Sequence, residues 1–272
     1  MRFRHRALPM RVIFGAGRVA ELDELGLRRV LVLSTPGRQE LARDVAESLG
    51  EHSVGVHPHA SEHVPVQAAA AAAKAAMDAD ADGCVAVGGG ATIGLAKGLA
   101  LELKLPVVAV PTTYSGSEMT PIWGLTDADG KRTGRDDAVL PRSVVYDPEL
   151  TLSLPVGVSV TSGFNALAHA VEALYAPDGS PVISLLAAEG VRALAEALPA
   201  VVAQPHDVDV RGTALYGAWL CGACLGATTM GLHHQLAHIL GGSFGLSHAG
   251  THSQPVARSL PVTALRRYAE SP

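Results

Sequence analysis

The stretch from Val85 to Ala100, VAVGGGATIGLAKGLA, changes character in its middle. The residues before Gly88 are apolar and prone to form a strand, and those after Gly90 are typical of a helix. A strand that enters a helix through glycines exposes backbone N–H groups at the helix N-terminus, and this arrangement binds phosphate. The stretch therefore predicts a phosphate-binding turn. It matches neither of the common glycine-rich nucleotide motifs, and a tight turn without a ligand is the alternative.

Strand-like and helix-like segments alternate around this stretch. The sequence predicts strands at 11–15, 29–35, 53–58, 84–90 and 107–113, and helices at 18–26, 39–50, 64–79 and 91–103. Such alternation implies a parallel sheet with helices on both faces. Open sheets of this kind bind ligands at the carboxyl ends of their strands. The loop after the last of these strands, PTTYSGSEMTP at 111–121, is rich in hydroxyl groups, so we expect it to be a second ligand-binding loop.

The second half of the chain has another pattern. Beyond about residue 150 no segment reads as a strand, and helices are predicted at 159–176, 180–203 and within 210–241. We therefore expect an α/β, Rossmann-like dinucleotide-binding domain at 1–150, followed by an all-helical catalytic domain at 151–272. The uncharged run 212–242 is long enough to span a bilayer, but its Gly, Thr and His residues favour a pair of buried helices.

The composition excludes several classes of protein. Hydrophobic residues make up 48% of the 272 residues and aromatic residues only 4%, so a substantial core is built from Ala, Val and Leu. A net charge of −5 without a basic block argues against nucleic acid as a partner. The basic N-terminus lacks the apolar region of a secretory signal, and Cys84, Cys221 and Cys224 make no disulfide framework. We therefore expect a cytoplasmic protein with neither nucleic acid nor membrane as a partner.

Histidines gather in GLHHQLAHILGGSFGLSHAGTH at 231–252, which holds five of the chain's twelve. His234 and His238 are four residues apart and would share one face of a helix. His248 follows a glycine-containing turn that could return it to the same face. The segment is either a metal or catalytic site, or part of a histidine-rich surface.

A matching pair lies in SGFNALAHAVEAL at 162–174, where Asn165 and His169 are four residues apart. Together with His234 and His248 they could form a four-ligand metal cluster, in which the imidazoles are sound ligands and the amide is a poor one. The alternative is that each of them is a hydrogen-bonded residue of the core.

Taken together, these motifs resemble the iron-containing alcohol dehydrogenase family. The resemblance extends to about His252, and it includes RVIFGAGRVAEL at 11–22, LPRSVVYDPELTLSLP at 140–155 and ALYGAWLCGACLG at 214–226. It implies a Rossmann-like cofactor domain followed by an all-helical domain, as in dehydroquinate synthase-like proteins, with the active site in the cleft between them. It also implies NADH or NADPH as the cofactor and a homodimer.

The resemblance assigns roles to residues by position. Along the cofactor pyrophosphate it places Gly88, Gly89, Gly90, Thr92 and Lys97. On the nicotinamide side it places Thr112, Thr113, Ser117 and Thr120. The ligand positions of the metal-using relatives correspond to Asn165, His169, His234 and His248.

Three residues that differ from the metal-using relatives indicate which reaction of the family to expect. Those relatives carry Asp at the positions of Asn165 and Gly94, and Ser at the position of Ala91. The first two changes resemble the branch of the family that reduces the carbon–carbon double bond of an unsaturated oxo-dicarboxylate in the degradation of aromatic compounds. We therefore expect that a divalent Fe or Zn ion is not required. NADH and NADPH both stay open, because STPGRQ at 34–39 lacks an acidic residue and Arg38 would tolerate a 2′-phosphate.

In such a reduction the developing enolate needs a hydrogen-bond donor, and a proton must be delivered to carbon. The candidates for both tasks are His169, His234, His238 and His248. The carboxylates of the substrate need cationic anchors, for which Lys131, Arg135 and His63 are candidates. A solvated hairpin is the alternative for the first two.

Two other functions stay open on the sequence alone. One is a metal-dependent alcohol or hydroxyacid dehydrogenase of the same fold. The other is a truncated, non-catalytic remnant, because the similarity fades after His252 whereas the family continues through further helices. We expect an incomplete second domain that leaves the apolar helix predicted at 228–240 partly uncovered. Lower stability and activity than in longer relatives would follow.

Overall fold

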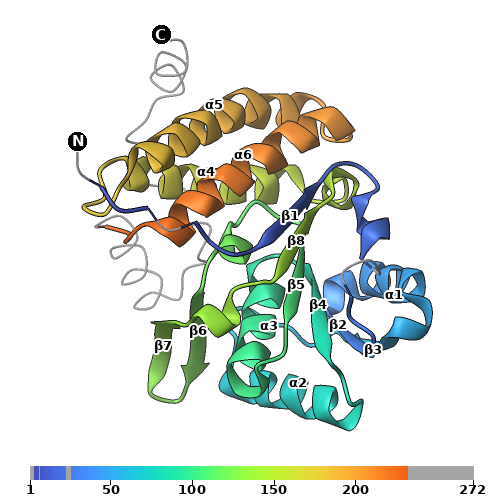
Figure 1. Cartoon of the computed structure of the whole chain (residues 1–272). Coiled ribbons are helices and arrows are strands. Elements are labelled where there is room, and N and C mark those ends of the chain that lie inside the picture. The colour runs from blue at the N-terminus through green and yellow to red at the C-terminus, as the bar shows by residue number, and fades with distance from the viewer. Residues whose placement is uncertain (1–2, 6, 23–25, 232–272) are drawn as a thin grey trace. The chain divides into compact units, whose positions relative to one another are not determined.

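In a computed structural model (Figure 1), the chain folds into two compact units, and the structure describes residues 3–5, 7–22 and 26–231. The first, which we term the sheet unit, consists of residues 9–112 and 121–147. The second, which we term the helical unit, consists of the described residues of 1–8, 113–120 and 148–272. The segment 113–120 therefore interrupts the sheet unit in sequence but belongs to the helical unit.

The core of the sheet unit, within the described residues, is a six-stranded parallel sheet with the order β1-β8-β5-β4-β2-β3. Its strands are β1 (Arg11–Phe14), β2 (Val30–Leu33), β3 (Ser53–His57), β4 (Gly83–Gly88), β5 (Val107–Pro111) and β8 (Ser143–Tyr146). All residues of β2, β4, β5 and β8 are buried, as is usual for strands covered on both faces. The predicted parallel sheet is confirmed, and β8 is a strand that the sequence reading missed.

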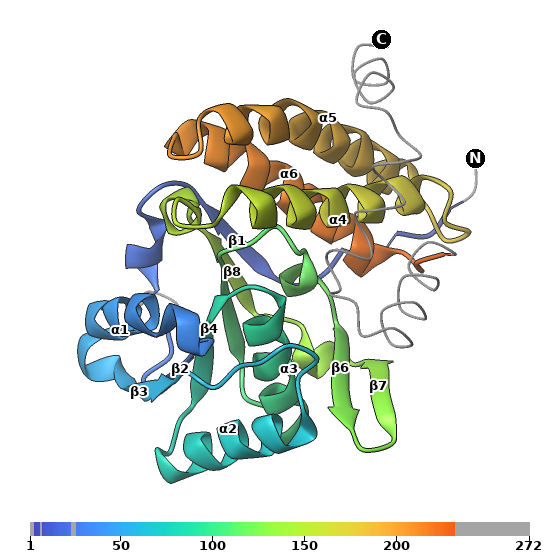
Figure 2. The ribbon, with the colours of Figure 1, turned by 180° about the vertical axis from the view of Figure 1, so that it is seen from behind.

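The direction of the connections places the helices of the sheet unit. α1 (Gln39–Ser48) leads from β2 outward to the edge strand β3, whereas α2 (Val66–Asp78) and α3 (Gly90–Leu103) lead back across the sheet. Because such crossovers share one handedness, opposite directions put α1 on one face and α2 and α3 on the other. In agreement, α2 packs against α3 and α1 packs against β2 and β3 (Figure 1, Figure 2).

The helix predicted at 18–26 is wrong. The described residues there form only the 3-10 turn Arg18–Glu21, and none of its residues is buried. A short, charged segment without a buried apolar face does not offset the cost of nucleating a helix.

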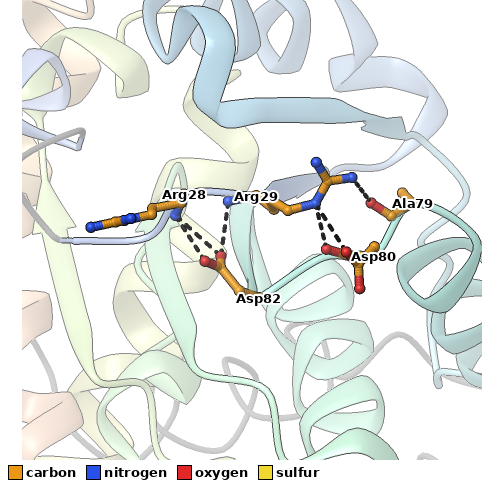
Figure 3. A network of polar contacts seen from close by, with 5 residues as sticks. All are labelled: Arg28, Arg29, Ala79, Asp80 and Asp82. Atoms are coloured by element: carbon orange, nitrogen blue, oxygen red, sulfur yellow. Dashed lines mark hydrogen bonds and ion pairs between the residues drawn. The ribbon is translucent and has the colours of Figure 1, made fainter.

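A polar network ties the start of β2 to the turn between α2 and β4 (Figure 3). The Asp82 carboxylate accepts hydrogen bonds of 3.0 Å from the backbone N–H groups of Arg28 and Arg29. The Arg29 guanidinium donates to the carbonyls of Ala79, at 2.6 Å, and Asp80, at 2.7 Å. Since Asp82 directly precedes β4, these bonds hold the amino ends of β2 and β4 together.

An antiparallel hairpin follows the segment 113–120 and returns the chain to the sheet unit. Its strands are β6 (Ile122–Asp127) and β7 (Gly130–Arg135), and β6 lies against α3. All residues of β7 are exposed except Gly134, which lies under the Trp123 indole. In this hairpin β6 is therefore the half-buried strand, and β7 is the solvent-exposed strand.

The helical unit is built on three long helices, α4 (Val156–Leu174), α5 (Pro181–Ala203) and α6 (Val208–Ala227), each of which packs against the other two (Figure 2). Glycine permits the close approach of α5 and α6, because a Cβ on Gly217 would lie 2.8 Å from Leu194 Cγ. The helices predicted at 159–176 and 180–203 are confirmed. Within the described residues, no helix combines the length and apolarity needed to cross a bilayer.

The end of α6 corrects the predicted start of the histidine-containing helix. Thr228 is extended, with φ of −127° and ψ of 162°, and residues 228–231 are not helical. The Asp178 carboxylate accepts hydrogen bonds from the Thr229 N–H, at 3.0 Å, and hydroxyl, at 2.8 Å, which stabilises this extended path. The rest of the predicted helix lies outside the described residues, and with it His234, His238 and His248.

Candidate functional site

The glycine turn has the geometry that the sequence predicts. Gly88 ends β4, Gly89 is the N-cap of α3, and Gly90 is the first helical residue. A Cβ on Gly88 would lie 2.3 Å from Thr92 Oγ1, so only glycine fits there. No side chain of the described residues caps α3. The first N–H groups of the helix are thus without a side-chain partner, which suits them to bind an anion.

Three residues predicted to contact the cofactor support this turn from within the protein. Thr92 is fully buried, and its Oγ1 has no hydrogen-bond partner in the described part of the chain. Thr112 donates from its backbone N–H to the Gly88 carbonyl at 3.1 Å, which ties the end of β5 to the turn. Lys97 is buried as well, and its ammonium donates to the Ile122 carbonyl at 2.8 Å. Contact of these residues with a pyrophosphate or nicotinamide stays a prediction.

A strained turn lies against the first part of α3. His63 and Val64 have φ of 62° and 43°, a region that β-branched and other non-glycine residues rarely adopt. Thr126 of β6 holds the turn, because its Oγ1 donates to the His63 carbonyl at 2.6 Å and its N–H donates to the Val64 carbonyl at 3.0 Å. A Cβ on Gly94 would lie 2.7 Å from Val64 Cγ2. The space that a carboxylate at position 94 would need is therefore filled by Val64.

Two of the three predicted substrate anchors, Lys131 and His63, each lie next to Thr126. Lys131 pairs across the hairpin with Thr126, the residue that holds His63. Desolvation by the surrounding protein lowers the pKa of Lys131 below its ordinary value. No ion pair to Lys131 occurs among the described residues, although Arg132 beside it pairs with Asp127 at 2.9 Å. Arg135 lies at the other end of β7, opposite Ile122.

In the helical unit, Asn165 and His169 both face the loop 113–120. They lie one turn apart on α4 and are almost fully buried, with 3% and 2% of their surface exposed. Asn165 Nδ2 lies 3.4 Å and His169 Nε2 lies 3.2 Å from the Ser115 carbonyl oxygen. Asn165 Nδ2 also lies 3.3 Å from His169 Nε2, so this nitrogen donates to the carbonyl in one tautomer and accepts from the amide in the other. The Asn165 Oδ1 and Ser115 Oγ atoms are buried without a hydrogen-bond partner in the described residues.

This donor set is a poor fit for the metal ion that the resemblance implies. His169 Nε2 already contacts a backbone carbonyl and the Asn165 amide nitrogen, and Asn165 offers a neutral amide oxygen where metal-using relatives offer a carboxylate. Among the described residues, no group of three or more His, Cys, Asp or Glu side chains could hold a metal ion. His234 and His248, the other two ligand positions, lie outside the described residues.

The loop 113–120 is fixed to the helices at several points. Gly116, with φ of 79°, lies against α6, where its Cβ would be 3.0 Å from Gly222 Cα. Thr120 Oγ1 donates to the Ser117 carbonyl at 3.1 Å, so this predicted cofactor residue closes the loop on itself. The sequence analysis did not single out Tyr114, which belongs to this loop, or Arg211, which donates a hydrogen bond to it. The available signal was a lone arginine at the start of the long apolar run of α6.

The sheet unit thus carries an uncapped glycine turn, and the helical unit carries a buried Asn–His pair. Matches to known proteins define the class, an oxidoreductase with a nicotinamide cofactor of the NAD(H) type. The family model for iron-containing alcohol dehydrogenase matches residues 9–148, and the model for the C-terminal part of the Fe-containing alcohol dehydrogenase family matches residues 159–265. The chain belongs to the iron-containing alcohol dehydrogenase family.

Individual relatives are similar over most of the chain. It is 54% identical over 260 residues to maleylacetate reductase of Burkholderia cepacia, which covers 94% of this chain and 74% of that protein. It is also 54% identical over 268 residues to maleylacetate reductase of Sphingobium indicum, with 97% and 76% covered. The crystal structure of maleylacetate reductase from Agrobacterium tumefaciens superposes with a TM-score of 0.92 at 46% identity, and covers 99% of this chain and 84% of that one.

Proposed function

We propose that this chain is a maleylacetate reductase, which reduces the carbon–carbon double bond of maleylacetate to give 3-oxoadipate in the degradation of aromatic compounds. The observation that carries the proposal is the identity of 54% over 260 residues to a maleylacetate reductase. Two local features support it. Asn165 and Gly94 stand where metal-using relatives have carboxylates, and Val64 fills the space beside Gly94.

The cofactor is NADH or NADPH, and when bound it supplies the hydride. In this proposal its pyrophosphate lies on the turn Gly88–Gly90, and its nicotinamide side contacts Thr112 and the hydroxyl-rich loop 113–120. The first N–H groups of α3 and the positive end of the helix dipole stabilise the phosphate charge. The segment after β2 has no acidic residue, and Arg38 ends its 3-10 turn Pro36–Arg38, so a ribose with or without a 2′-phosphate is accepted.

The residues of this chain act on the substrate as hydrogen-bond donors and proton donors. Addition of hydride to the double bond places a negative charge on the conjugated ketone oxygen, and the neighbouring carbon must then take a proton. His169 Nε2 lies 3.2 Å from a neutral carbonyl in the present structure, and in the tautomer that carries a proton there it is the kind of donor that stabilises such an oxyanion. His234, His238 and His248 share this task and the proton delivery in the proposal. Lys131 and His63, with Arg135, attract the carboxylates.

The assembly and environment of the enzyme complete the proposal. We place it in the cytoplasm as a homodimer that binds a small dicarboxylate and no nucleic acid. Light scattering on a size-exclusion column would measure the oligomeric state directly.

The test is oxidation of NADH or NADPH by the purified protein with maleylacetate as the acceptor, followed by identification of 3-oxoadipate. Short alcohols and hydroxyacids, with and without added Fe²⁺ or Zn²⁺, are the competing substrates. Turnover of maleylacetate without added metal supports the proposal. Metal-dependent oxidation of an alcohol without turnover of maleylacetate would replace it with a dehydrogenase of the same family, and cofactor binding without any turnover would indicate a non-catalytic remnant.

A further inference from the structure

Arg211 is a fully buried cation at the start of α6. The acceptors of its guanidinium are all neutral: the Pro205 carbonyl at 2.8 Å from Nε, the Leu154 carbonyl at 2.9 Å from Nη2, and from Nη1 the Ser159 hydroxyl at 2.6 Å and the Tyr114 hydroxyl at 3.3 Å. No carboxylate pairs with it in the part of the chain that the structure describes. Burial of a charge without a counter-ion is costly, so a side chain of this kind indicates a specific task.

Most of these bonds tie helices to one another. Pro205 precedes α6, Leu154 precedes α4, and Ser159 lies in the first turns of α4. Tyr114 differs, because it belongs to the loop 113–120, which carries the predicted nicotinamide contacts. The planar fork of arginine reaches all of these acceptors at once, whereas a lysine ammonium is a single point of contact.

Tyr114 connects Arg211 to the candidate site. Its side chain is fully buried, its hydroxyl accepts from Arg211, and its backbone N–H donates to Ser162 Oγ at 3.4 Å. The tyrosine is therefore fixed at both ends. The next residue is Ser115, whose carbonyl oxygen lies 3.2 Å from His169 Nε2 and accepts from Asn165 Nδ2 at 3.4 Å. A shift of Tyr114 would move this carbonyl and release the orientation of the imidazole.

We propose that Arg211 is a positioning residue: through Tyr114 it sets the Ser115 carbonyl, which orients His169 and the loop 113–120 for the reaction. It touches neither substrate nor cofactor in this scheme. The inference rests on the proposed function only in that His169 acts on the substrate. A role confined to stability, in which Arg211 merely joins α4 to α6, is the competing explanation.

The structure provides a matched pair of variants to separate the two explanations. Arg211→Met would leave several buried acceptors unpaired and threatens the fold, so the test uses the acceptors instead. Tyr114→Phe removes the hydroxyl on the loop, and Ser159→Ala removes the hydroxyl on α4. Both hydroxyls accept from the same nitrogen, Nη1, and both residues are fully buried. We expect each variant to lower the melting temperature by about 2–4 °C.

Catalysis should distinguish them. For Tyr114→Phe we expect kcat for maleylacetate-dependent NADH oxidation to fall about 10-fold or more, with little change in the KM for maleylacetate. For Ser159→Ala at a similar loss of thermal stability, kcat should stay within about twofold of the original protein. Equal losses of kcat in both variants, or none in Tyr114→Phe, would overturn the inference.

A second measurement keeps this test separate from the proposed substrate. NADH binding, followed by fluorescence titration, should weaken about threefold or more in Tyr114→Phe and stay unchanged in Ser159→Ala, because only the tyrosine belongs to the loop. If the original protein does not reduce maleylacetate, the proposed function fails. The difference in NADH affinity between the two variants then tests the positioning role of Arg211 by itself. Equal NADH affinities in the two variants would then contradict its positioning role.

Discussion

The glycine turn of the sheet unit and the Ser115–Asn165–His169 cluster of the helical unit are built in opposite ways. The turn consists of consecutive residues and offers backbone N–H groups. It therefore requires small residues that leave these groups open, and no particular side chain. The cluster joins the carbonyl of a loop to side chains that follow 50 and 54 residues later. Each of its members is oriented by another.

This difference predicts how the two regions respond to substitution. A turn made of backbone amides binds an anion wherever its path stays open, so a substitution there should act on cofactor affinity. A buried polar cluster works only when each hydrogen bond is in place, so a substitution there should act on turnover. Single variants of each region can therefore show whether cofactor affinity and turnover change independently.

The largest effect is expected for His169→Ala. Loss of the imidazole should lower kcat for maleylacetate reduction about 100-fold or more, since general acid and oxyanion functions contribute at that scale. His206→Ala, which removes an exposed histidine from the same unit, is the control. Steady-state kinetics would measure both. A similar kcat for the two variants would show that the Asn–His pair serves packing alone. We expect the same loss for His234→Ala and His238→Ala.

The next effect belongs to the glycine turn. In Gly89→Val a side chain occupies the place of the phosphate, so NADH should bind at least about tenfold more weakly, or ~1.4 kcal/mol, while kcat at saturating NADH stays near its original value. Gly157→Ala is the control, because nothing lies within 4 Å of a Cβ at that position. Fluorescence titration gives both affinities. An unchanged affinity in Gly89→Val would remove the turn from the cofactor site.

The same contrast explains what could be predicted from the sequence. The turn at Gly88–Gly90 was predictable because its strand, glycines and helix are neighbours along the chain. The long helices of the second half were predictable from their apolar runs. β8 escaped, because four buried residues, SVVY, show no alternation that distinguishes a strand.

Long-range features could not be predicted in the same way. Arg211 reaches Ser159, 52 residues earlier, and Tyr114, 97 residues earlier, and no local pattern records such contacts. The left-handed turn at His63 and Val64 is held by Thr126, from a hairpin 63 residues later. The sequence suggested His63 and Lys131 as anchors of one substrate, but that both lie next to Thr126 is visible only in the fold.

A smaller effect should appear where the strained turn meets α3. Gly94→Ala places a Cβ 2.7 Å from Val64 Cγ2, so we expect a loss of about 1–3 kcal/mol in the free energy of unfolding. Val64→Ala removes the opposing methyl group. In the double variant, Gly94→Ala should therefore cost less than about 0.5 kcal/mol beyond Val64→Ala alone. Urea unfolding of the four proteins completes this cycle. Additive losses would show that another contact keeps position 94 small.

The smallest effect is expected from removal of metal ions. The described cluster offers a neutral amide oxygen in place of a carboxylate, and a neutral amide holds a divalent ion less firmly. Dialysis against a chelator should therefore leave maleylacetate reduction within about twofold of its starting rate, and Fe²⁺ or Zn²⁺ should not increase it.

Asn165→Asp supplies the contrast for this measurement. It places a carboxylate 3.4 Å or less from the Ser115 carbonyl, where the amide Nδ2 now donates, and a bound cation would offset that repulsion. We expect this variant, and not the original protein, to retain about one equivalent of Zn²⁺ after desalting, measured by elemental analysis. Loss of activity from the original protein on chelation, with recovery on adding Fe²⁺ or Zn²⁺, would mean that histidines outside the described residues complete a metal site despite Asn165. Asn165 and His169 would then belong to a metal centre and not to a hydrogen-bonded cluster.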